Sequence, residues 1–329
     1  MTSTATTRHG FNPATTEPNP EVPIATQEDL DKAVDAGRAA FKTWSKSSFA
    51  DRRAALLAYA DAIEANIDGF SKTLTMEQGK PLSQSQTEVG MAATWIRGLS
   101  AIEIPTNIIE ETEDRKVIQR YTPMGVAGAI VPWNFPVLLA VGKIVPAVYT
   151  GNAVIVKPSP FTPYCDLKLA ELATRFFPPG IVQCLSGDDT LGPMMTEHPG
   201  IDKISFTGSI ATGKRVMASC AKTLKRVTLE LGGNDPAIVC DDVDIDAVIP
   251  KVGPSPQTRK SQRLTRFIDW HSLVPVHLPD LHDDQTSLCT REDLRPVLGE
   301  VDRIRQDPQG RRGYRVRRLL WPRTKQDAI

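Results

Sequence analysis

Short β-branched runs alternate with helix-length stretches through the middle of this 329-residue chain. A run of four to six such residues fits one buried strand, and each stretch between runs can cross back over a sheet. The alternation therefore predicts a doubly wound, mostly parallel α/β sheet with right-handed crossovers. Strands are expected at residues 126–131, 153–156, 182–185, 203–206, 226–229 and 237–239. Helices are expected at residues 135–148, 163–177, 191–198 and 212–220.

The segment before this sheet is predicted to be helical. Thr26 precedes two acidic residues, as an N-cap does, and apolar spacing indicates four helices up to about Leu99. The second is expected to end near Asn66, and Gly79 is expected to stop the third. Between about residues 106 and 122, polar and apolar residues alternate, which predicts an antiparallel hairpin standing off the main body.

The totals exclude several classes of protein. Basic and acidic residues are equal in number, 39 of each, so no overall charge favours nucleic acid. Five scattered cysteines indicate a reducing, cytoplasmic location, without disulfides or a metal site. The apolar stretch 125–151 contains Asn134, Lys143 and three prolines, so it is predicted to be a buried strand and helix, not a membrane span. The N-terminus lacks the apolar core of a secretory signal, and only Arg8 and His9 leave a transit peptide open.

The composition changes near Gly253. Arginine replaces lysine as the main basic residue, no alanine occurs between Ala247 and Ala328, and prolines interrupt every candidate element. We expect a domain at residues 10–252 and a disordered or unrelated tail at residues 253–329. The alternative is an arginine-rich arm for nucleic acid or an acidic partner. Acidic residues are interspersed among the arginines, and no aromatic platform accompanies them, which argues against that arm.

Two polar residues at strand ends are candidates for chemistry. Asn134 follows the strand expected at 126–131, where its amide could stabilise an oxyanion or could simply cap the next helix. Lys157 closes the next strand and could reach a ribose hydroxyl or a phosphate. The alternative for Lys157 is a solvated lysine at a strand end.

Two further candidates follow later strands. Gly208 and Ser209, with Gly213 in the next helix, form a strand–turn–helix whose backbone N–H groups suit a pyrophosphate, although this spacing alone is weak evidence. Glu230 ends an apolar strand before two glycines. Desolvation there would raise the pKa of its carboxyl toward the range of a general base. The alternative is a capped or salt-bridged structural glutamate.

Taken in order, these motifs resemble the aldehyde dehydrogenase superfamily, over about three-quarters of the chain. The matching segments are Asn12-Pro13-Ala14-Thr15, Glu77-Gln78-Gly79-Lys80-Pro81, Trp133-Asn134, Lys157-Pro158-Ser159, Phe206-Thr207-Gly208-Ser209 and Leu229-Glu230-Leu231-Gly232-Gly233-Asn234. The resemblance implies oxidation of a small aldehyde to a carboxylic acid with NAD or NADP. It also implies a Rossmann-like cofactor domain and homo-oligomers, with the hairpin as an oligomerisation arm. Of the elements through which relatives assemble, this chain retains only a part.

The resemblance also implies roles for individual residues. Asn134 would be the oxyanion donor, Glu230 the base that activates water, and Lys143 part of a proton path. The residues implied at the cofactor are Trp133, Lys157, Gly208, Ser209, Gly213 and Leu231. Pro160 stands where many relatives have an acid that holds the ribose, so the choice between NAD and NADP stays open.

The chain departs from the family at the nucleophile. Relatives carry a cysteine in a Gly-Gln-x-Cys context a few tens of residues after the glutamate, but here residues 261–266 read Ser-Gln-Arg-Leu-Thr-Arg. Cys289 lies too far along and in a different context. Without a thiolate the acyl-enzyme route is closed. The sequence thus leaves two hypotheses: an impaired aldehyde dehydrogenase, or a non-catalytic cofactor-binding remnant whose tail arises from an altered reading frame or an erroneous gene model.

Overall fold

The computed structural model describes residues 6–233, and the structural statements below concern this part of the chain. The chain divides between Gly232 and Gly233 into two units, and the fold is that of the first. The strand predicted at residues 237–239 and the tail at 253–329 lie outside the described residues.

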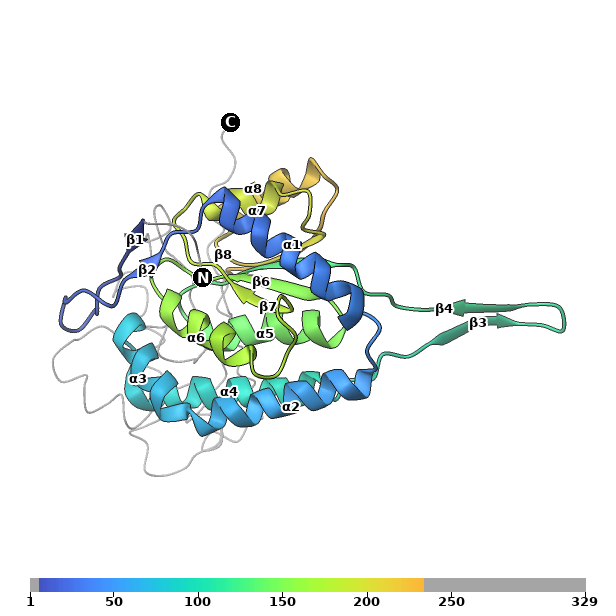
Figure 1. The fold of residues 1–329 in the computed structure, drawn as a ribbon, viewed down its shortest axis with the longest axis horizontal. Helices are drawn as coiled ribbons and strands as arrows, with labels where there is room; N and C mark the ends of the chain where they lie inside the picture. The colour runs from blue at the N-terminus through green and yellow to red at the C-terminus, as the bar shows by residue number, and fades with distance from the viewer. Residues whose placement is uncertain (1–5, 234–329) are drawn as a thin grey trace, which may run out of the picture. The chain divides into compact units, whose positions relative to one another are not determined.

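Five parallel strands form the central sheet, in the order β7-β6-β5-β8-β9 (Figure 1). Their bounds are β5 Val126–Ile130, β6 Ala153–Lys157, β7 Val182–Cys184, β8 Lys203–Gly208 and β9 Arg226–Leu231. Every residue of β5 and β6 is buried, as expected for strands covered on both faces. The prediction of a doubly wound parallel sheet is confirmed. The last two strands run two residues further than predicted because Thr207 and Gly208 continue the ladder opposite Glu230 and Leu231.

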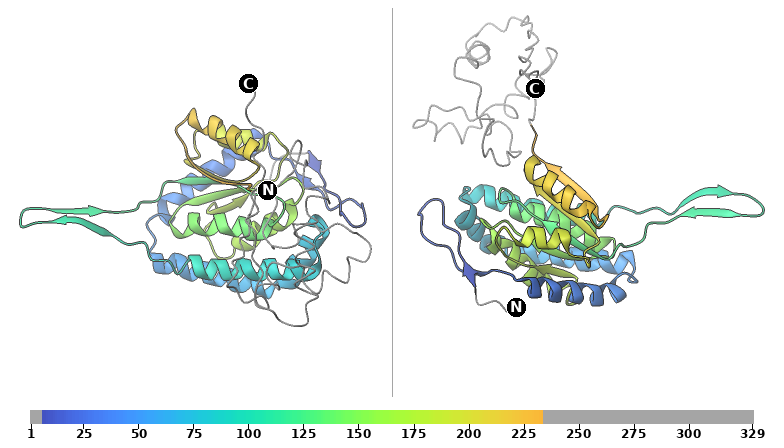
Figure 2. Two further views of the ribbon diagram at one scale, coloured as in Figure 1. Left: turned by 180° about the vertical axis from the view of Figure 1, so that it is seen from behind. Right: turned by 90° about the horizontal axis from the view of Figure 1, so that it is seen from above.

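Helices cover both faces of the sheet. The crossover helices are α5 Pro136–Tyr149, α6 Pro163–Ala173, α7 Leu191–Glu197 and α8 Ile210–Ala221. Helices α5 and α6 lie on one face, and α7 and α8 lie on the other (Figures 1 and 2). Helix α6 ends four residues before its predicted end, because residues 174–176 form tighter turn bonds such as Phe176 N–H to the Ala173 carbonyl, 3.0 Å, and a proline follows Phe177.

Four helices precede the sheet, as predicted. They are α1 Gln27–Trp44, α2 Phe49–Ala65, α3 Ile67–Gln78 and α4 Leu82–Leu99. Helix α1 packs on the sheet beside α7, whereas α2–α4 form a further layer over α5 and α6 (Figure 1). Thr26 is the predicted N-cap, in a reciprocal capping box with Asp29. Gly79 ends α3 in the left-handed conformation, φ 87°, that glycine adopts without steric cost.

A two-stranded antiparallel hairpin projects from this body, as predicted (Figure 1). Its strands are β3 Asn107–Glu111 and β4 Lys116–Gln119. Ile108 and Ile118 face each other across it, and Ile109 is 64% exposed. A second pair, β1 Thr7–Arg8 and β2 Val22–Pro23, was not predicted because two-residue strands leave no periodic signal. In residues 6–233, no helix is long and apolar enough to cross a membrane.

Candidate functional site

The carboxyl ends of the parallel strands bring the predicted site residues to one edge of the sheet. The strand order reverses between β5 and β8, since β6 and β7 follow on one side of β5 and β8 on the other. Ligands of doubly wound sheets bind in the crevice at such a reversal. The residues at or just beyond this edge are Trp133, Asn134, Lys157, Gly208, Ser209, Glu230 and Leu231.

Asn134 is buried just beyond β5. Its Oδ1 accepts a hydrogen bond from the Phe135 backbone N–H at 3.0 Å, and its backbone carbonyl accepts one from Lys80 Nζ at 2.9 Å. Helix α5 takes Phe135 as its N-cap and has no side-chain cap, so the interpretation of Asn134 as a helix cap is wrong. The side chain is instead held with its carbonyl oxygen turned to the backbone N–H of Phe135.

Lys157 is also buried, and only 7% of it is exposed. Burial lowers the pKa of its ammonium group, while the charge of Asp189 acts in the opposite direction. Its Nζ donates to the Pro158 carbonyl at 3.3 Å, a long bond. The interpretation of Lys157 as a solvated surface lysine is therefore wrong. A buried cation at a strand end is suited to an anionic or hydroxyl-rich ligand.

The turn after β8 is built around Ser209. Its hydroxyl caps α8 by accepting from Thr212 N–H at 3.2 Å, and its carbonyl accepts from Gly213 N–H at 2.9 Å. Within the described residues, the N–H groups of Ile210 and Ala211 remain to face an anion at the helix N-terminus. Gly213 therefore does not offer its own N–H to a ligand.

Gly213 has a packing role at the same helix end. A Cβ at this position would lie 2.5 Å from Cδ2 of Leu231, so the missing side chain lets α8 approach the end of β9. The resemblance places Gly213 against the pyrophosphate, and in the structure its Cα faces the side chain of Leu231.

The prediction that the Glu230 carboxyl is desolvated is wrong for the described part of the chain. The side chain is exposed, because β9 is the outer strand of the sheet and its last two residues are open to solvent. The expected desolvation is therefore absent in the described part of the chain. The alternative of a salt-bridged glutamate is not met either, since none of the ion pairs among residues 6–233 includes Glu230.

The charge of Glu230 acts on Lys143. Lys143 projects from α5, and its Nζ lies 3.1 Å from Oγ of Ser205 on β8. Burial lowers the pKa of Lys143 to about 8, and the Glu230 charge partly opposes that shift. An amine that titrates near neutral pH beside a carboxylate is able to pass a proton. The two residues that the resemblance links to proton transfer therefore interact through their charges.

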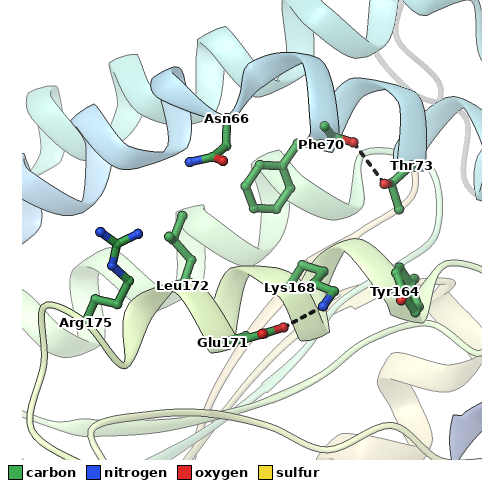
Figure 3. Close-up of a pocket in the computed structure, with 9 residues that line it drawn as sticks. Asn66, Phe70, Thr73, Tyr164, Lys168, Glu171, Leu172 and Arg175 are labelled. Carbon is green, nitrogen blue, oxygen red and sulfur yellow. Dashed lines mark hydrogen bonds and ion pairs between the residues drawn. The ribbon is translucent and has the colours of Figure 1, made fainter.

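A groove of about 390 Å³ between α3 and α6 contains none of the predicted residues (Figure 3). Phe70 and Leu172 supply apolar surface, and Lys168 forms an ion pair with Glu171 at 2.7 Å. The groove lies between two helices and not at the strand ends, so we do not assign the site to it.

Sequence reasoning missed two residues behind the site. Lys80 and Glu88 form a buried ion pair next to Asn134. Lys80 belongs to the Glu-Gln-Gly-Lys-Pro segment, to which the resemblance assigns no role. The contact of Lys80 with Asn134 could not be inferred from the sequence because the two residues lie 54 positions apart.

The model of the aldehyde dehydrogenase family matches residues 1–262 of this chain. The chain belongs to the aldehyde dehydrogenase family. Aldehyde dehydrogenase LUC3 of a Fusarium species is 44% identical over 243 residues, which are 74% of this chain and 51% of that protein. Geranial dehydrogenase of Castellaniella defragrans is 38% identical over 249 residues, 73% of this chain and 52% of that protein.

Solved aldehyde dehydrogenases share the fold. The NAD+ complex of an aldehyde dehydrogenase from Bacillus cereus superimposes with a TM-score of 0.72 at 33% identity, over 75% of this chain and 52% of that one. This member of the aldehyde dehydrogenase family therefore spans about half the length of these relatives.

Proposed function

We propose that this chain binds NAD or NADP along the carboxyl edge of its sheet, as the cofactor-binding unit of an aldehyde dehydrogenase. The observation that carries the proposal is the convergence of Lys157, the α8 N-terminus and the Trp133–Asn134 segment on one edge of a parallel sheet. The Bacillus cereus relative, whose structure is an NAD+ complex, supports the choice of cofactor.

Three features of the edge fit a dinucleotide. The N–H groups of Ile210 and Ala211, which have no backbone partner in residues 6–233, favour a pyrophosphate at the α8 N-terminus, and Lys157 adds a buried positive charge. The Thr207 hydroxyl, one residue before Gly208, is buried and has no hydrogen-bond partner among the described residues. A buried hydroxyl without a partner costs free energy unless a ligand or water completes it.

The bound cofactor would supply a nicotinamide ring that accepts hydride from the aldehyde carbon. The chain's own residues would then act around the aldehyde. The Asn134 amide N–H groups would stabilise negative charge that develops on the aldehyde oxygen. Glu230 would take a proton from water, and Lys143 would relay it away from the carboxylate.

We further propose that this chain oxidises aldehydes only slowly or not at all. No cysteine occupies the family position after Glu230, so no thiohemiacetal can form there. The chain would then serve as a non-catalytic cofactor-binding protein, or its tail would be the product of a wrong reading frame. Translation of the other frames downstream of Val252 separates these: a Gly-Gln-x-Cys segment in one of them would identify the tail as an artefact.

Cofactor binding tests the central proposal directly. We expect NAD or NADP to quench the tryptophan fluorescence of the full chain, and Lys157→Ala to weaken binding about tenfold or more, as for loss of one charge-assisted contact. Lys168→Ala, in the groove between α3 and α6, is the matched control and should bind normally. Equal affinity of the Lys157 variant and the wild type would remove Lys157 from the site. Absorbance of NADH with a panel of aldehydes measures turnover separately.

We also propose that the hairpin is an oligomerisation arm between copies of the chain. Its exposed apolar residues support this: they are Ile108, Ile109, Val117, Ile118 and Tyr121. An exposed two-stranded ribbon has open edges that can pair with another chain.

The three cysteines in the described residues are unpaired, which supports the proposed cytoplasmic location.

A further inference from the structure

A buried ion pair lies directly behind Asn134. Lys80 follows the glycine that ends α3, and Glu88 lies on α4, two turns into the helix. Their side chains are 7% and 0% exposed, and Lys80 Nζ donates to Glu88 Oε2. Burial raises the pKa of the Glu88 carboxyl, and the Lys80 charge works against that rise. This pair contributes no group to the edge of the sheet itself.

Both members of the pair reach across to the junction of β5 and α5. Lys80 Nζ donates to the Asn134 carbonyl at 2.9 Å and lies 4.0 Å from the centre of the Phe135 ring. The second oxygen of Glu88, Oε1, accepts from the Leu138 N–H at 3.2 Å, in the first turn of α5. The pair therefore holds the chain on both sides of Phe135, through one acceptor before it and one donor after it.

These bonds do more than stabilise the fold. Replacing a buried ion pair by apolar residues of similar size is often neutral for stability, so stability alone does not explain the pair. What an apolar pair cannot do is hold the Asn134 carbonyl, because it offers no donor. The Asn134 side chain is in turn bonded to the next N–H along, that of Phe135, so a shift of this backbone would move the side-chain amide.

We infer that Lys80 is a positioning residue that orients the Asn134 amide, and that Glu88 holds Lys80 in place. The geometric part stands on the contacts above. The catalytic meaning rests on the proposed function, in which Asn134 is the oxyanion donor. Lys80 itself touches neither the proposed aldehyde site nor the cofactor.

The Phe135 backbone N–H provides a direct reading, because it is bonded to the Asn134 side chain. Hydrogen exchange of this amide, followed by NMR in the full chain, should be slow in the wild type and fast in Asn134→Ala, which sets the scale for a lost bond. In Lys80→Met we expect Phe135 exchange about tenfold faster or more, approaching the Asn134→Ala rate. Unchanged Phe135 exchange in Lys80→Met would overturn the inference.

Lys80→Met leaves Glu88 buried without its partner and could weaken the whole fold, so the deciding variant is Lys80→Met/Glu88→Gln. Glutamine keeps an oxygen for the Leu138 N–H but carries no charge. We expect the melting temperature to recover toward the wild-type value while Phe135 exchange stays fast. If both recover together, the pair is only structural and the inference fails.

Arg97→Met is the matched control on the same helix, since Arg97 forms exposed ion pairs with Asp61 and Glu64. It should leave Phe135 exchange at the wild-type rate. Cofactor binding with the Lys157→Ala variant is measured independently. If Lys157→Ala shows that the cofactor does not bind as proposed, the Phe135 exchange rates still test whether Lys80 positions Asn134. Failure of the Phe135 test likewise leaves the cofactor-binding result valid.

Discussion

Gly213 lies against Leu231, so closely that any side chain at position 213 would press on the end of β9. The contact joins the first turn of α8 to the last residue of the sheet. The N-terminus of α8 and the carboxyl end of β9 are therefore held at a distance that glycine sets. Both belong to the proposed cofactor edge.

Gly213→Ala is expected to change the site more than the stability. Alanine favours a helix interior by about 1 kcal/mol over glycine, and the displaced atoms belong to the flexible, exposed end of Leu231. We expect the free energy of unfolding to stay within about 1 kcal/mol of wild type and cofactor affinity to fall severalfold. Gly69→Ala on α3, where a Cβ meets nothing within 4 Å, is the control. Equal gains in stability and unchanged affinity in both variants would contradict this role for Gly213.

The Glu230 carboxylate is expected to raise the pKa of Lys143. Burial lowers the pKa of the lysine to about 8, and Glu230 opposes the shift, so Glu230→Gln should lower that pKa further. NMR titration of the Lys143 side chain measures it. Glu197→Gln, which breaks an exposed pair with Lys222, should leave the Lys143 pKa unchanged. A Lys143 pKa that does not respond to Glu230→Gln would show that the two groups do not interact.

The lowered pKa of Lys143 should also make the stability of the fold depend on pH. Because the folded pKa of Lys143 lies below the ordinary 10.5, burying its charge costs free energy at and below about pH 8, and the cost disappears as pH rises toward 10.5. At pH 7, the free energy of unfolding of Lys143→Met should therefore be larger than that of wild type by up to roughly 3 kcal/mol. The difference from wild type should shrink by pH 10. A constant difference across this range would argue against the lowered pKa.

Asp166 on α6 is expected to destabilise the fold increasingly as pH rises. It is buried, neither carboxyl oxygen has a hydrogen-bond partner among the described residues, and burial raises its pKa well above the ordinary value. The unfolded state ionises from about pH 4 upward, whereas the folded state stays protonated to a higher pH. Asp166→Ala should therefore raise the free energy of unfolding by about 1–3 kcal/mol at pH 7 and by less at pH 4.

Chemical denaturation at the two pH values checks this. Asp35→Ala, at an exposed position on α1, is the control and should change stability little at either pH. An Asp166→Ala variant that is less stable than wild type at pH 7 would mean that the carboxyl has a partner within the folded chain.

The hairpin is expected to drive self-association. Ile109→Asp places a charge at the most exposed apolar position of β3 and should lower the average mass in sedimentation experiments. Stability should change by less than about 0.5 kcal/mol, because the side chain is already in solvent. Glu113→Gln, in the turn of the hairpin, is the control. A wild-type chain that stays monomeric at every concentration would exclude this surface.

Local sequence patterns were enough for most of the fold. The β-branched runs identified β5 to β9 because each strand is short and most are buried, and Thr26 and Gly79 marked helix ends through their own backbone preferences. The ends of β8 and β9 were missed because they depend on pairing between the two strands. Residues 174–177 were predicted as helix because composition alone does not distinguish a helical turn from a tighter one.

The site was predictable in position but not in environment. Motifs placed Lys157 and Glu230 at strand ends, yet the burial of one and the exposure of the other follow from the order of the strands. Among the strands of residues 6–233, Lys157 ends an inner strand and Glu230 ends an outer one. The hydrogen bond from Lys80 to the Asn134 carbonyl joins residues that are far apart in the sequence, so no local pattern predicts it.

The order of the strands also bears on how the protein is made. Within residues 6–233, Leu231 is the last residue of the sheet, and helices α1 to α8 all precede it in the chain. Because synthesis proceeds from the N-terminus, every strand and every helix of this body leaves the ribosome before residues 234–329 do. The nascent chain can therefore pair strands β5 to β9 while its remaining residues are still being translated.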